Sequence, residues 1–219
     1  MKYLTYIRCT FGVLAFLLCM SCSALHHEQP QIAQFKELSN PIKPIVVNRH
    51  WIHNGNKKLD VSKLKYEIYQ ISKTLPNIQY SKNLSNLIVE TIAVETNLGQ
   101  SNYLKNDHIT RNYGLGQFVL STAKHILKVQ KRSDPKTYHA MMKYYDHSMS
   151  LKDNVRKNVK FTIALQLEYY KMCDKNINKN ISTVYARAKV WKKHYNTVHG
   201  TGTVQSYVAT VKRHLGDRS

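Results

Sequence analysis

The chain has 219 residues, of which 42% are hydrophobic and 21% are charged, so it can form a hydrophobic core of ordinary size. Only eight glycines and five prolines exclude a collagen-like chain and argue against long disordered tracts. Lys and Arg outnumber Asp and Glu by 33 to 13, and the resulting charge of +20 predicts a polyanionic partner: nucleic acid, anionic lipid or a negatively charged cell wall.

Residues 1–24 have the layout of a secretory signal peptide. Two basic residues precede an apolar run from Phe11 to Met20, and small residues follow up to Ala24. The apolar run is shorter than the roughly 20 residues of a membrane-spanning helix. Cleavage after Ala24 would release a soluble protein, lipidation of Cys22 would anchor it, and an uncleaved anchor is a third alternative. We therefore expect export to the bacterial periplasm or cell envelope, and no nucleic-acid partner.

Residues 25–59 are expected to form an irregular lead-in or tether. Three prolines and the polar run from Asn54 to Lys58 interrupt any helical period. The histidines of this segment have no spacing that matches a zinc site, so no metal is predicted.

From residue 60 to 219 the apolar residues recur with helical spacing, which predicts one mainly α domain. The first helix begins behind Asp60 as N-cap and ends at Pro76, and the second covers 81–98, starting at Ser81 or Ser85. Alternating strand patterns are nearly absent. Further helices are predicted at 118–130, 134–147 (behind the start signal Ser133-Asp134-Pro135), 151–172, 181–196 and 203–215.

The second predicted helix carries two carboxylates in an apolar stretch, Glu90 and Glu95. Helical spacing places Glu95 on the stripe of Leu84, Ile88 and Ile92, whereas Glu90 lies about 140° away on a more mixed surface. Burial raises the pKa of a carboxyl, which is the condition that a general acid needs near neutral pH. We therefore expect Glu95 to face inward as a candidate acid, and a surface cap or lysine pair is the alternative.

The segment NYGLGQF, residues 112–118, is predicted to be a turn that opens a helix. Gly114 and Gly116 allow a ligand to approach the backbone closely, and Gln117 offers an amide donor and acceptor. A turn without a ligand would explain the glycines equally well.

Aromatic and amide side chains gather in residues 194–208. Tyr195 and Asn196 end one predicted helix, and Tyr207 lies inside the next. Tyrosine stacks against sugar rings, and asparagine can hold hydroxyl and acetamido groups. Packing of the tyrosines in the core is the alternative.

Taken in order, these segments resemble the lytic transglycosylase and goose-type lysozyme family over about residues 80–212. That family has a catalytic Glu followed by Ser, a Gly-Leu-Met-Gln turn, an Asn-Ile-x-x-Gly-x-x-Tyr-Leu helix, an Ala-Tyr-Asn-x-Gly stretch and a final Tyr-Val. The similar residues here are Glu95-Thr96, Gly114-Leu115-Gly116-Gln117, loosely Asn158-Val159 through Tyr169, Tyr195-Asn196 and Tyr207-Val208. Thr replaces Ser, Gly116 replaces Met, and the Gly soon after Tyr-Asn is missing.

The resemblance implies a lysozyme-like helical fold with a glycan-binding groove, and cleavage of the β-1,4 bond between N-acetylmuramic acid and N-acetylglucosamine in peptidoglycan strands. Glu95 would act as acid and then as base while the muramoyl 6-hydroxyl closes onto C1, leaving a 1,6-anhydro end and needing no cofactor. The residues implied to bind substrate are Thr96, Gly114, Gly116, Gln117, Tyr195, Asn196 and Tyr207.

Two other functions stay open. If Asp107 held a water opposite Glu95, the enzyme would be a hydrolysing goose-type lysozyme. Gly116 in place of Met favours instead a non-catalytic, basic wall-binding protein of the same fold. In each case the positive charge of the protein would attract the carboxylates on peptidoglycan stems. A protein that opens the wall as the partner of a secretion machine would carry out the same chemistry.

Overall fold

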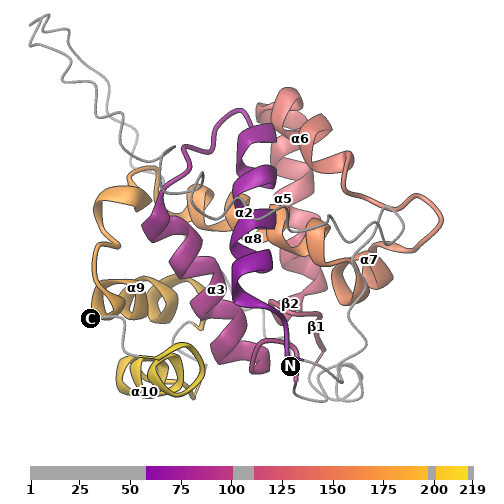
Figure 1. The fold of residues 1–219 in the computed structure, drawn as a ribbon. Coiled ribbons are helices and arrows are strands. Elements are labelled where there is room, and N and C mark those ends of the chain that lie inside the picture. The colour runs from indigo at the N-terminus through magenta and orange to yellow at the C-terminus, as the bar shows by residue number, and fades with distance from the viewer. Residues whose placement is uncertain (1–57, 101–110, 197–200, 217–219) are drawn as a thin grey trace, which may run out of the picture. The chain divides into compact units, whose positions relative to one another are not determined.

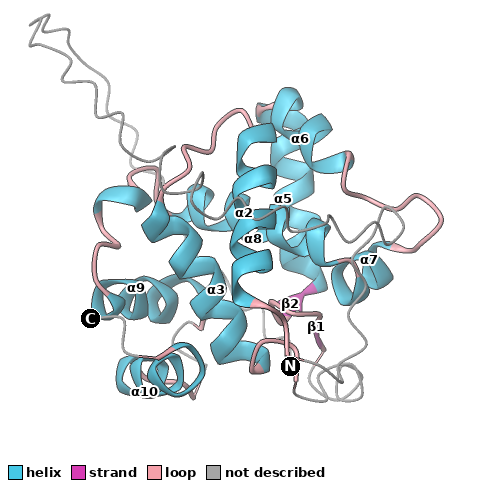
Figure 2. Cartoon of the chain, viewed as in Figure 1, coloured by secondary structure: helices cyan, strands magenta, loops and turns pink. Residues whose placement is uncertain are grey.

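The part of the chain that the structure describes is mainly helical, as the sequence predicts (Figures 1 and 2). It comprises residues 58–100, 111–196 and 201–216 of a computed structural model. All of these residues belong to one compact unit, Val46–Ser219. The expected signal peptide, Cys22, Asp107 and the lead-in up to residue 57 lie outside the described residues.

Helices α2 and α3 begin at their predicted caps. α2 spans Val61–Thr74, and the Asp60 carboxylate accepts a backbone hydrogen bond of 2.8 Å from its first turn. α3 spans Lys82–Thr96, and the Ser81 hydroxyl accepts a similar bond of 3.0 Å. These side chains satisfy amides that have no partner within the helix.

A β-hairpin occupies the position where the sequence predicts the start of the third helix. β1 (Asn112–Tyr113) pairs antiparallel with β2 (Phe118–Val119), so the prediction of a helix from Phe118 is wrong by two residues. Positive φ angles at Gly114 and Gln117 reverse the chain and bring the strands together. Helix α5 follows directly at Leu120–Ser133.

Helix α6, Pro135–Met142, has the predicted start, because the Asp134 side chain accepts from the Thr137 amide and Pro135 occupies the first turn. It ends five residues before the predicted His147. The backbone of Asp146 bonds instead to the side chain of Asn154, which holds the chain in a turn.

The predicted helix 151–172 is two helices in the structure. α7 spans Leu151–Lys157 and α8 spans Val159–Cys173, with Asn158 between them in an extended conformation. The buried Asn158 side chain accepts from the Phe161 amide and donates to the Tyr144 carbonyl at 2.7 Å. Its local bonds compete successfully with continuation of the helix.

Helix α8 is the central element of the unit, and it packs against α2, α3, α5, α6 and α7 (Figure 1). Every residue from Phe161 to Glu168 is buried, including the polar Gln166. A helix enclosed on all sides has no solvent face, so its sequence shows little amphipathic contrast.

The C-terminal helices form a smaller cluster around Trp191 and Tyr207. α9 spans Val184–Val190 and continues into a π-helical turn, η2, at Trp191–Tyr195. α10 spans Val204–Leu215, close to the predicted 203–215, and packs against α3 and α9. None of the helices in the described ranges is long and apolar enough to cross a bilayer.

Replacing Asn158 with Ala is expected to lower the free energy of unfolding by about 2–3 kcal/mol, because the helix cap is lost and the partly buried Tyr144 carbonyl loses a donor. Urea unfolding of the purified protein measures the change. Asn176→Ala is the matched control, since this asparagine is exposed, and it should change stability by less than about 0.5 kcal/mol. Equal losses in the two variants would contradict the capping role.

Candidate active site

Glu95 lies in the last turn of α3 and is partly exposed. The helix ends directly after it, because Asn97 and Leu98 both adopt positive φ angles of 50° and 57°. The Asn97 amide donates to the Ala93 carbonyl and closes the final turn. The Glu95 carboxyl therefore lies beside the turn that ends α3.

The indole of Trp191 holds the Glu95 carboxyl. Its Nε1–H donates to Oε1 of Glu95 at 2.9 Å. Burial raises the pKa of Glu95 from 4.5 to about 7, and the hydrogen bond from Trp191 opposes that rise because it stabilises the charged form. Glu95 is consequently close to half-protonated at neutral pH.

A π-helical turn presents Trp191 and Tyr195 to the site. The Asn196 amide donates to the Trp191 carbonyl at 2.9 Å, which is the i to i+5 bond of this geometry. Tyr195 donates its hydroxyl to the Gly116 carbonyl, while Trp191 binds Glu95. One short element therefore contacts both the end of α3 and the glycine turn.

The turn between β1 and β2 is tied to the end of α3 as well. The Thr96 hydroxyl donates to the Ile92 carbonyl at 3.0 Å and to the Leu115 carbonyl at 3.3 Å. Gln117 folds back, and its side-chain amide donates to the Gly114 carbonyl at 2.9 Å. The end of α3, the glycine turn and η2 thus converge, so that Trp191 binds Glu95 while Tyr195 binds Gly116.

Gly116 is needed because polar side chains fill the space beside it. A Cβ at this position would lie 2.7 Å from the Tyr195 hydroxyl and 2.8 Å from Nε2 of Gln166. Gln166 also donates to the Tyr195 hydroxyl at 3.3 Å. A methionine side chain, as found at this position in the family that the sequence resembles, would not fit at Gly116.

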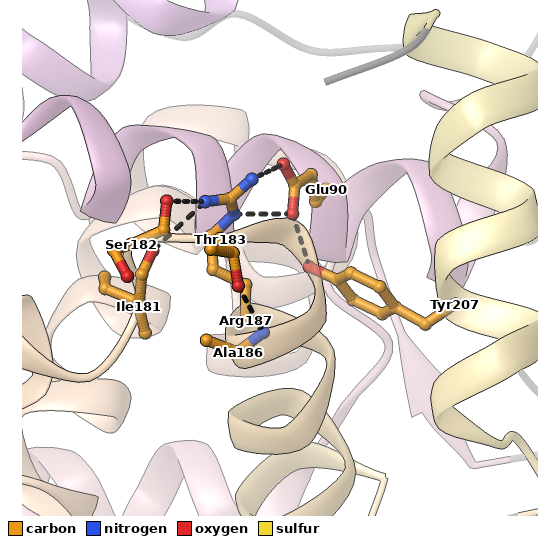
Figure 3. A network of polar contacts seen from close by, with 7 residues as sticks. All are labelled: Glu90, Ile181, Ser182, Thr183, Ala186, Arg187 and Tyr207. Atoms are coloured by element: carbon orange, nitrogen blue, oxygen red, sulfur yellow. Dashed lines mark hydrogen bonds and ion pairs between the residues drawn. The ribbon is translucent and has the colours of Figure 1, made fainter. Parts of the chain in front are cut away.

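The prediction for Glu90 is wrong: its side chain is fully buried and ionically paired rather than on a mixed surface (Figure 3). Arg187 donates to both Glu90 oxygens at 2.8 Å, and the Tyr207 hydroxyl donates to Oε2 at 3.0 Å. Residues Leu87 to Ala93 are all buried, so α3 has no solvent face in this stretch. Helical periodicity alone cannot reveal such an environment.

Four of the predicted substrate-binding residues are buried in the structure, Thr96, Gly114, Gly116 and Tyr207, and Val155 and Tyr195 occupy the space beside the two glycines. Tyr207 is 0% exposed and Thr96 is 1% exposed, so neither side chain can line a groove in this structure. Both act through hydrogen bonds inside the protein. Asn196 is partly exposed, and its Oδ1 accepts from Lys192 Nζ at 2.9 Å.

Sequence analysis misses three residues beside this site: Trp191, Gln166 and Tyr170. Trp191 precedes Tyr195 by four positions in a predicted helix, and that spacing was the signal that could have paired them. A polar Gln166 within an apolar run was a weaker signal. Tyr170, whose hydroxyl bonds to Thr91 at 2.8 Å, had none.

Within the described residues, no group of three or more His, Cys, Asp or Glu side chains could hold a metal ion. Comparison with protein-family models, with curated proteins and with solved structures gives no match to this chain. The function is therefore inferred from the residues themselves.

Gly114→Ala is expected to destabilise the protein by roughly 3 kcal/mol or more, because φ is +70° and the new Cβ would lie 2.0 Å from the Val155 carbonyl oxygen. Gly216→Ala is a matched control with φ of +80° and no atom within 4 Å of the new Cβ. Because its ψ is −179°, a conformation found almost only in glycine, this variant should cost about 1–3 kcal/mol of backbone strain and no steric clash. Thermal unfolding compares the two variants, and a similar loss in each would show that Val155 does not confine the turn.

Glu95→Gln is expected to flatten the dependence of stability on pH. The raised pKa means that Glu95 stabilises the fold fully below pH 4.5, and this contribution is lost as the pH rises through about 7. Between pH 5 and pH 9 the wild type should lose on the order of 2 kcal/mol more than the variant, measured by urea unfolding.

Asp153→Asn provides the control for this measurement. A hydrogen bond from Ser150 lowers the pKa of Asp153 below 3.8, so its contribution changes only in acid. This variant should keep the wild-type dependence between pH 5 and pH 9. A Glu95→Gln profile that also parallels the wild type would contradict the burial of the Glu95 carboxyl.

Proposed function

We propose that the protein is a peptidoglycan lytic transglycosylase with a lysozyme-like fold, in which Glu95 is the catalytic acid and base. The observation that carries this proposal is the state of Glu95, a partly exposed carboxyl at a helix end with a pKa of about 7. A group with this pKa can donate a proton and take one back at neutral pH.

The reaction needs one such group. Glu95 gives its proton to the glycosidic oxygen as the bond from that oxygen to C1 of the muramoyl residue breaks. The 6-hydroxyl of the same sugar then forms a bond to C1 and returns its proton to Glu95. Because the attacking oxygen belongs to the substrate, no second carboxylate is required to activate water.

The surroundings of Glu95 suit this chemistry. Glu90 lies five residues earlier but is paired with Arg187, so its charge is compensated. Gln117 on the hairpin and Asn196 after η2 are partly exposed and would bind saccharide, whereas Gly116 is buried against Tyr195. Tyr195 holds the Gly116 carbonyl and thereby orders the turn.

The charge distribution supports an anionic polymer as substrate. The stretch from Lys175 to Gly216, which includes η2 and α10, contains no Asp or Glu. Its basic residues, apart from the buried Arg187 that pairs with Glu90, are Lys175, Lys179, Lys189, Lys192, Lys193, Lys212 and Arg213. Carboxylates on peptide stems would be attracted to this end of the protein, more weakly as salt is added.

Incubation of purified protein with peptidoglycan, followed by mass analysis of the released fragments, tests the proposal. The wild type should release 1,6-anhydromuropeptides, with a rate that falls as the pH rises above about 7 because Glu95 loses its proton. Glu95→Gln should reduce the rate by about a thousandfold.

Glu168→Gln is the matched control for this substitution. Glu168 is also buried, with a pKa raised to about 7, but it accepts from Gln130 and faces α5. This variant should retain activity. Products with reducing ends would indicate a hydrolysing lysozyme, and binding to intact sacculi without cleavage would indicate a wall-binding protein.

A further inference from the structure

Among the described residues, Trp191 is the hydrogen-bond donor to Glu95. It donates to only one of the two carboxyl oxygens, Oε1. An indole N–H can donate but cannot accept. The oxygen that it binds must therefore be an acceptor whether the carboxyl is charged or neutral. In the neutral acid, the oxygen that accepts is the carbonyl oxygen.

We propose that Trp191 is a positioning residue for Glu95. The indole of Trp191 fixes Oε1 of Glu95 as the permanent acceptor and so assigns the exchangeable proton to Oε2. The catalytic consequence rests on the function proposed above, whereas the geometry does not. Without such a donor, the proton could reside on either oxygen and the carboxyl could rotate. With it, the acid has one orientation before and after proton transfer.

The Trp191 ring is held on several sides. It is 1% exposed and packs on the Tyr207 ring, with 5.1 Å between the ring centroids. A Cβ at Gly202 would lie 2.5 Å from the indole, so the chain before α10 also closes against the ring. Tyr207 is in turn fixed by Glu90, which lies on the same helix as Glu95.

The other ionisable groups near Glu95 cannot take over this role. Tyr170 bonds to Thr91, and Tyr195 donates to the Gly116 carbonyl. Burial raises the pKa of both tyrosines well above 10, so they stay neutral throughout the range in which Glu95 titrates. Glu90, on the same helix, is neutralised by Arg187 and also contacted by Tyr207.

The indole also matters in the second half of the proposed reaction. Once Glu95 has given up its proton, its carboxylate is partly shielded from water and depends on Trp191 for stabilisation. Hydrogen bonds to charged groups contribute about 1.5–3 kcal/mol. Loss of the donor should therefore make Glu95 a weaker acid.

The fluorescence of Trp191 provides a test that is independent of catalysis. The chain has two tryptophans, so Trp51→Phe leaves Trp191 as the sole tryptophan, which can be excited selectively over the fifteen tyrosines. Its emission should titrate with a midpoint near pH 7, since the indole donates to Glu95. Adding Glu95→Gln should abolish this transition. A flat profile in Trp51→Phe, or an unchanged transition with Glu95→Gln, would overturn the proposal.

Trp191→Phe tests the donor directly, because it removes the N–H and keeps an aromatic ring. The pKa of Glu95, followed by carbon NMR of its carboxyl, should rise by about one pH unit. Tyr195→Phe is the matched control: it lies in the same π-helical turn but donates elsewhere, and it should leave that pKa near the wild-type value. Equal pKa values in wild type and Trp191→Phe would contradict the role.

On peptidoglycan, Trp191→Phe should move the alkaline limb of the pH–rate profile upward by about one pH unit and lower kcat about tenfold, with little change in KM. A merely structural role would lower the rate without moving the limb. If the wild type cleaves nothing, the proposed function fails, while fluorescence and NMR still decide the role of Trp191.

Discussion

The structure depends on one buried ion pair, Glu90 with Arg187. Taking both charges out of water is costly, and the bidentate geometry together with the Tyr207 hydroxyl compensates for that cost. Arg187 also donates to the carbonyls of Ile181 and Ser182, which fixes the chain before α9 (Figure 3). Three segments that are distant in sequence, α3, α9 and α10, are joined by this single network.

That network extends to the candidate site through packing. Arg187 lies one helical turn before Trp191, and Tyr207 packs on the indole that binds Glu95. The two glutamates of α3 therefore have complementary roles. Glu90 is charged, paired and fully enclosed, whereas Glu95 is partly exposed and has its charge disfavoured by burial. Environment, not residue type, separates a structural carboxylate from a candidate acid.

Local signals in the sequence predict most helix starts, because capping depends on neighbouring residues alone. Asp60, Ser81 and Pro135 are examples, and Thr203 caps α10 with a reciprocal bond from Ser206. Long-range bonds decide the features that the sequence does not reveal. Asn158 interrupts a helix through a bond to Tyr144, fourteen residues away.

The candidate site shows the same division. The order of Glu95, the glycine turn and Tyr195 can be read along the chain, and the structure brings these three together. The burial of Glu90 and Tyr207 depends on Arg187, ninety-seven residues from Glu90, and no periodicity indicates it. Trp191 and Glu95 are ninety-six residues apart, and the sequence carries no recognised signal for the π turn that begins at Trp191.

The π turn also determines which changes this segment can tolerate. Lys193 is exposed in its middle, so many side chains would be accepted there. Deleting a single residue is different, because the bond from the Asn196 amide to the Trp191 carbonyl would have to be replaced by an ordinary i to i+4 bond. Such a deletion would change the spacing of Trp191 and Tyr195 around the helix, and with it their contacts with Glu95 and Gly116. The number of residues in this π-helical turn is thus under stricter constraint than the identity of an exposed residue within it.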